Sequence, residues 1–128
     1  MAVHKSGEDY LEAILMIQKE KGSCRSIDIV HHLGVSKPSV SVAMGILRED
    51  GMITTNEDGF MSFTESGYKL ATEIYARHVL LTDFLTSIGV DPETAKDDAC
   101  KIEHDISRET FACLQKHIDQ MKAAGDNA

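Results

Sequence analysis

Residues 26–53 constrain the fold most, because they predict two helices joined by a tight turn. Gly34 permits the turn, Ser36 can cap the second helix, and Pro38 falls in its first turn, where a missing backbone N–H costs little. The core-facing residues are predicted from their helical spacing: Ile27, Val30 and Leu33 in the first helix, and Val40, Ala43, Met44 and Leu47 in the second. This pattern predicts a helix-turn-helix.

The other side of the second helix carries small residues, including Gly45, with a cation near each end. Small side chains allow a helix to enter a DNA major groove closely, and cations can contact phosphates. An ordinary helical hairpin is the alternative interpretation. On the helix-turn-helix interpretation we expect DNA contacts from Ser36, Lys37, Pro38, Ser39, Ser41, Val42 and Arg48.

A β-hairpin is predicted next, because β-prone pieces flank the turn sequence Asn-Glu-Asp-Gly at residues 56–59. A hairpin directly after a recognition helix is the wing of a winged helix. The rest of the chain is predicted to be helical, over about 66–88, 93–103 and from Ser107 on. The apolar stripe of the last helix exceeds what its own core needs, which indicates a homodimer interface.

The composition fits one modest core, with 128 residues of which 42% are hydrophobic. We therefore expect a mainly α protein, with a winged helix-turn-helix domain at 1–65 and a helical dimerisation domain at 66–128. The apolar runs are too short to cross a bilayer, and no secretion signal opens the chain. Three widely spaced cysteines do not form a disulfide pattern, so we expect a cytoplasmic protein without a membrane partner. The net charge of −8 is unusual for a DNA-binding protein.

A candidate metal site lies in the sequence DDACKIEH, where Cys100, Glu103 and His104 stand at i, i+3 and i+4 and share one helix face. Thiolate, carboxylate and imidazole together suit a first-row transition metal. Three solvated polar residues are the alternative. Asp9 and Glu12 add a second acidic pair, although acids near a helix start also favour the helix dipole.

Taken together, the motifs EDYLEAI, the helix-turn-helix, FTESG, RHVLL and ACKIEHDIS resemble the diphtheria-toxin-repressor family of metal-dependent transcriptional regulators. The resemblance covers nearly the whole chain. It is nearest to the manganese transport regulator branch, because the chain stops after the dimerisation helices, without a third SH3-like domain. The resemblance implies two metal ions per protomer, held by six residues: Asp9, Glu12, His78, Cys100, Glu103 and His104.

Three positions differ between the branches of that family. Cys100 is the residue of the iron-responsive members, where the best-known manganese regulators have glutamate, whereas Asp9 stands where the iron branch has methionine. The set of ligands is therefore a hybrid, and we expect Mn(II) or Fe(II) as the cofactor. Val42 replaces a base-contacting glutamine of the iron branch, so the operator sequence does not carry over.

The resulting prediction is a homodimeric regulator, not an enzyme, that binds double-stranded operator DNA when loaded with Mn(II) or Fe(II) and represses metal-uptake genes. Two alternatives stay open. One is a winged-helix regulator that does not depend on metal. The other is a metallohydrolase, since carboxylates and histidine can activate water, but neither a glycine loop nor a set of substrate-binding residues accompanies the cluster.

Overall fold

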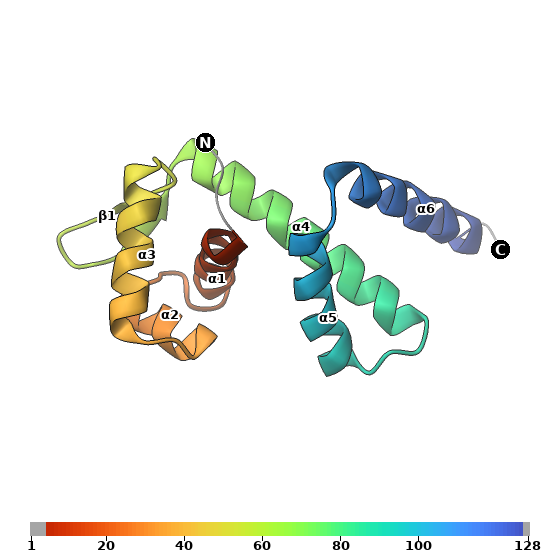
Figure 1. Cartoon of the computed structure of the whole chain (residues 1–128), viewed down its shortest axis with the longest axis horizontal. Coiled ribbons are helices and arrows are strands. Elements are labelled where there is room, and N and C mark those ends of the chain that lie inside the picture. The colour runs from red at the N-terminus through yellow and green to blue at the C-terminus, as the bar shows by residue number, and fades with distance from the viewer. Residues whose placement is uncertain (1–4, 127–128) are drawn as a thin grey trace. The chain divides into compact units, whose positions relative to one another are not determined.

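A computed structural model describes residues 5–126 of the chain, which form six helices and two strands over that range (Figure 1). The chain divides into two compact units, which we call the winged unit, up to Tyr75, and the helical unit, from Ala76 on. In chain order the elements are α1 (Lys5–Lys21), α2 (Ser26–Leu33), α3 (Lys37–Glu49), β1 (Ile53–Thr55), β2 (Met61–Phe63), α4 (Glu65–Ser87), α5 (Pro92–Asp105) and α6 (Arg108–Asp126).

The predicted helix-turn-helix is confirmed by its local geometry. Gly34 ends α2 in the left-handed conformation, with φ 68° and ψ 32°. Ser36 caps α3, because its side chain accepts a hydrogen bond from the backbone N–H of Ser39 at 3.2 Å, and Pro38 lies in the first turn. These residues fix where α3 begins without help from distant parts of the chain.

The core of the winged unit is built from α1, α2, α3, the hairpin and the first half of α4, and α1 packs against α2 and α3. Val40, Met44 and Leu47 of α3 are buried as predicted, and Ala43 packs against them in part. The inward position predicted for Ile27 is wrong, because its side chain is 40% exposed. Ile29 is fully buried instead, and at 100° per residue it points about 200° away from Ile27.

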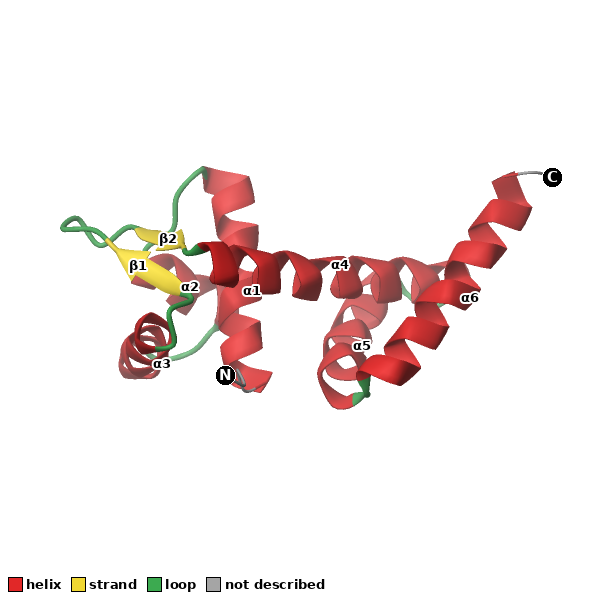
Figure 2. Cartoon of the chain, turned by 90° about the horizontal axis from the view of Figure 1, so that it is seen from above, coloured by secondary structure: helices red, strands yellow, loops and turns green. Residues whose placement is uncertain are grey.

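The predicted hairpin forms, with β1 and β2 antiparallel and Thr54 opposite Ser62 (Figure 2). The Asn56 side chain accepts hydrogen bonds from the backbone N–H groups of Asp58 and Phe60, at 2.9 and 3.0 Å, and closes the turn. The hairpin follows α3 directly and β1 packs against it, so the winged helix-turn-helix is confirmed.

The helical unit contains the second half of α4 together with α5 and α6, as the predicted fold class requires. Asp91 caps α5 through hydrogen bonds from the backbone N–H groups of Glu93 and Thr94, at 3.2 and 3.4 Å. The Arg77 guanidinium lies 5.7 Å from the centre of the Phe111 ring and links α4 to α6. The fully or nearly fully buried apolar residues of this unit are Leu81, Ala95, Ala99 and Ile118. None of the helices described over residues 5–126 is both long and apolar enough to cross a membrane.

Candidate metal centre

Glu103 is the most unusual polar residue of the helical unit. It lies in the last turns of α5 and is only 3% exposed. Neither of its carboxylate oxygens accepts a hydrogen bond from any residue that the structure describes. A buried carboxylate without hydrogen bonds is costly. The position therefore calls for a positive partner, which a divalent cation would supply.

Two histidine nitrogens face this carboxylate. Nδ1 of His78, from α4, and Nε2 of His104, from α5, each lie 3.5 Å from Oε1 of Glu103. The His104 side chain is fully buried, and that of His78 is nearly so. At 3.5 Å both distances exceed the 2.7–3.2 Å that is typical of a hydrogen bond from nitrogen to oxygen.

The spacing suits metal ligands in two groups, one containing the ligand atoms of His78 and Glu103 and the other those of Cys100 and His104. Nitrogen and oxygen ligands about 2.1 Å from an ion, at tetrahedral or octahedral angles, lie roughly 3.0–3.4 Å from each other. The separations of 3.5 Å between Glu103 and each histidine are close to this range. The donor set and its burial thus fit a transition-metal ion.

Cys100 extends the cluster by one turn of α5, and its ligand atom lies within 4.8 Å of a ring nitrogen of His104. The cysteine is half-buried and forms no disulfide. The helical unit therefore brings together four of the six predicted ligands: His78, Cys100, Glu103 and His104. The sequence had suggested three of them by their spacing alone, whereas His78 comes from another helix.

The other two predicted ligands belong to the winged unit. Asp9 and Glu12 lie one turn apart on α1, where Asp9 is half-buried and Glu12 is buried. Burying a carboxylate is costly, because removing its charge from water costs on the order of several kcal/mol. Glu12 is therefore more than a solvated acid near a helix start.

Cys24 is excluded as a ligand by its surroundings. It is fully buried in the core of the winged unit, and burial, aided by the nearby charge of Asp28, raises the pKa of its thiol to about 12. A metal binds the thiolate, and burial disfavours that form at this position.

The residues predicted to contact DNA lie on α3 and its cap. All seven are exposed, from Ser36 to Arg48. The Ser36 hydroxyl donates a hydrogen bond to Oγ of Ser39 at 2.8 Å, and Arg48 donates one to Oγ1 of Thr55 in β1 at 3.2 Å. Arg48 therefore ties the end of α3 to the hairpin, a link that the sequence did not predict.

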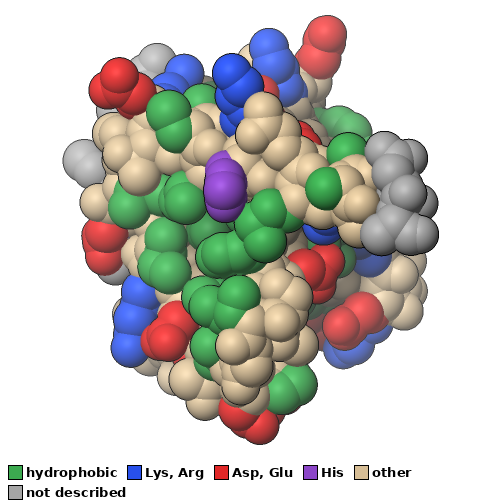
Figure 3. All heavy atoms as spheres, turned by 90° about the vertical axis from the view of Figure 1, so that its right-hand side faces the viewer, with side chains coloured by type: hydrophobic (Ala, Val, Ile, Leu, Met, Phe, Trp, Pro, Cys, Tyr) green, Lys and Arg blue, Asp and Glu red, His purple; other side chains and the backbone are tan. Residues whose placement is uncertain are grey.

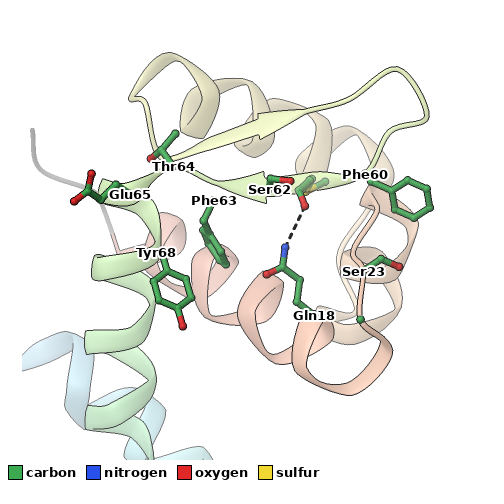
Figure 4. A pocket seen from close by; sticks show the side chains of 10 residues that line it. Gln18, Ser23, Phe60, Ser62, Phe63, Thr64, Glu65 and Tyr68 are labelled. Atoms are coloured by element: carbon green, nitrogen blue, oxygen red, sulfur yellow. Dashed lines mark hydrogen bonds between the residues drawn. The ribbon is translucent and has the colours of Figure 1, made fainter.

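A separate pocket of about 580 Å³ opens in the winged unit between the end of α1, β2 and the start of α4 (Figure 4). Its side chains include Gln18, Phe63 and Tyr68, and the Gln18 side-chain amide donates a hydrogen bond to the carbonyl of Met61 at 3.1 Å. Glu65 is its one ionisable carboxylate. Among the described residues, the groups able to hold a metal do not include any side chain that lines this pocket.

Comparison with known proteins gives a consistent result. Residues 3–59 match the family model described as the N-terminal DNA binding domain of iron dependent repressors, and residues 64–126 match the metal binding and dimerisation domain of the same proteins. The transcriptional regulator MntR of Escherichia coli O6:H1 is 37% identical over 114 residues, covering 86% of this chain and 74% of the relative.

Two further matches agree. The HTH-type transcriptional regulator MntR of Bacillus subtilis strain 168 is 37% identical over 102 residues, covering 80% of this chain and 72% of the relative. A solved manganese-dependent transcriptional repressor in complex with manganese superposes with a TM-score of 0.79 at 26% identity and covers 88% of this chain. The chain spans 52% of the length of that solved repressor.

Proposed function

Since this chain belongs to the iron-dependent repressor family of metal-dependent transcriptional regulators, we propose that it is a cytoplasmic homodimer that binds operator DNA when loaded with Mn(II) or Fe(II). We further propose that it represses metal-uptake genes. The single observation that carries the metal dependence is the buried Glu103 carboxylate faced by two histidine nitrogens at 3.5 Å. The proposal gives this cluster a regulatory role and no catalytic one.

We propose two ions per protomer, with Asp9 and Glu12 on α1 supplying further oxygen ligands. This part rests on the family resemblance and on the burial of Glu12, one turn after the half-buried Asp9 on the same face of α1. Metal binding would favour one arrangement of the two recognition helices of the dimer over others. A ligand shifts such an equilibrium by its differential affinity for the states, and two recognition helices must match the spacing of successive major grooves.

The homodimer is supported by apolar side chains that the helical unit leaves exposed. Ile88, directly after α4, and Met121 on α6 are both exposed, and Figure 3 shows hydrophobic side chains gathered on the face that it draws. A contiguous apolar surface of this kind marks an interaction site more often than a free surface.

The acidic composition fits metal activation. The chain has a net charge of −8 with neutral histidines. Two divalent cations per protomer would offset about half of that charge, which favours approach to DNA phosphates.

Metal-dependent DNA binding tests the proposal directly. Duplexes would be selected from a randomised library in the presence of Mn(II), and their affinities measured with Mn(II), with Fe(II) under anaerobic conditions, with Zn(II), and with chelator. We expect tight binding with Mn(II) or Fe(II) and weak binding with chelator, while helix content and the dimer persist. Equal affinity with chelator would refute metal as the effector.

The choice between manganese and iron is tested at the two hybrid positions. Asp9→Met removes a hard anionic oxygen, so activation by Mn(II) should suffer most. Cys100→Glu replaces a softer ligand and should shift activation toward Mn(II). The measured quantity is the ratio of the Mn(II) and Fe(II) concentrations that give half-maximal DNA binding. If both variants leave this ratio unchanged, neither residue is a ligand.

A further inference from the structure

The exposed side of α3 carries two large apolar side chains that the fold does not use. Val42 is 64% exposed and Ile46 is 50% exposed. They stand at i and i+4, so they are neighbours on the helix surface. Val42 lies about 200° around the helix from Val40, which is fully buried in the core. Val42 therefore points away from the core, and Ile46 is exposed beside it.

Gly45 lies beside this pair and has no reason within the fold to be glycine. It lies inside α3, and a Cβ built on it would meet only a side-chain nitrogen of Arg48, at 4.0 Å. Glycine inside a helix costs roughly 0.5–1 kcal/mol relative to alanine. A close approach by another molecule would account for a glycine at this position.

The charge around the pair favours a polyanion as that molecule. Of the 128 residues in the chain, 21 are Asp or Glu, yet residues 29–48 contain none and include Lys37 and Arg48. Glu49, which follows Arg48 and stands at i+3 from Ile46, is the one acid of α3. The rest of the exposed surface, apolar around the pair and with a cation near each end of the helix, suits the floor of a DNA major groove. The apolar group that the major groove presents is the 5-methyl group of thymine.

We propose that Val42 and Ile46 read thymine methyl groups in the operator, and that Gly45 allows the helix to approach these bases closely. The inference rests on the proposed function and deepens it, because it assigns a base preference to two named side chains. Ile46 is not among the residues that the sequence indicated as DNA contacts. Its spacing of four residues from Val42 was the available signal.

The test replaces single thymines by deoxyuridine in the Mn(II)-selected duplex, which removes one methyl group and leaves base pairing intact. We expect the affinity of the wild-type protein to fall about threefold to tenfold at one or two positions of each half-site, as for loss of a buried methyl contact. Val42→Ala or Ile46→Ala should abolish the effect at its own position.

Ile27→Ala is the matched control, because Ile27 is an apolar residue that is 40% exposed on α2. It should keep the full sensitivity to deoxyuridine. Both alanine variants of α3 change exposed residues to a good helix former, so they are expected to fold, and circular dichroism checks this.

Four outcomes would overturn the inference. Metal-dependent binding that is insensitive to deoxyuridine at every position would refute methyl reading and leave the proposed function standing. If the Val42→Ala, Ile46→Ala double variant stays sensitive to deoxyuridine, other residues must read the methyl groups. A changed oligomeric state of the α3 variants in sedimentation, with DNA affinity unchanged, would make this surface a protein interface. If no duplex binds in a metal-dependent way, the inference and the proposed function both fail.

Discussion

Replacing Gly45 by alanine should make the protein more stable and a weaker DNA binder. The added Cβ has open space in the free protein, since only a side-chain nitrogen of Arg48 lies near it, at 4.0 Å. The stability gain comes from the smaller conformational entropy that alanine loses on folding, about 0.5–1 kcal/mol in the free energy of unfolding. For a chain of this size that corresponds to a rise in Tm of roughly 2–6 °C.

The DNA affinity should change in the opposite direction. A methyl group placed where the helix approaches bases closely forces the two surfaces apart, at a cost typical of overpacking, about 1–3 kcal/mol. We expect the Kd for the selected duplex to rise about tenfold or more in the presence of Mn(II). Thermal denaturation of the metal-free protein and fluorescence anisotropy with labelled duplex measure the two quantities on the same preparation.

Gly67 supplies the matched control of opposite sign. It lies in the first turn of α4, and a Cβ built on it would come within 1.8 Å of the carbonyl oxygen of Met52, which is backbone. Gly67→Ala should therefore lower the free energy of unfolding, by about 1–3 kcal/mol or more. The reasoning about Gly45 is refuted if Gly45→Ala is more stable and still binds DNA with wild-type affinity.

Three further predictions address the cap, the metal cluster and the buried thiol. Ser39→Glu should abolish DNA binding, because it places a carboxylate near phosphates. It should keep or raise the Tm, because Ser36 at the cap and Glu three residues later form a capping box. A lowered Tm would contradict the cap geometry. Glu103→Gln should remove the rise in Tm that Mn(II) causes in the wild type. The metal-free variant should stay at least as stable as the wild type, because the charge that it loses is buried and accepts no hydrogen bonds. An undiminished rise in Tm with Mn(II) would exclude Glu103 as a ligand. The free energy of unfolding should fall as the pH rises from about 9 toward about 12. Folding raises the pKa of the Cys24 thiol from an ordinary 9.0 to about 12, so over this pH range the unfolded chain releases a proton that the folded chain keeps. Chemical denaturation of wild type and Cys24→Ala over this pH range measures it, and identical slopes would show that Cys24 does not contribute.

Some features of this protein were determined by the sequence alone. The start of α3 depends on Ser36, Pro38 and Ser39, and the hairpin turn depends on Asn56 and Gly59. Within each of these two groups, the residues are close neighbours in the sequence. Helical periodicity likewise predicted the buried face of α3 and the shared face of Cys100, Glu103 and His104. Capping, turn geometry and side-chain spacing are local, so neighbouring residues suffice to encode them.

Other features were decided only by tertiary structure. The sequence placed Ile27 inward, but packing of α2 buries Ile29 and leaves Ile27 exposed. It also did not show that His78 lies 3.5 Å from a carboxylate 25 positions later, nor that Gly67 passes close to Met52. The physical reason is that such approaches depend on how whole helices pack against each other. Periodicity identifies which side of a helix is apolar, but not which atoms of another helix it will meet.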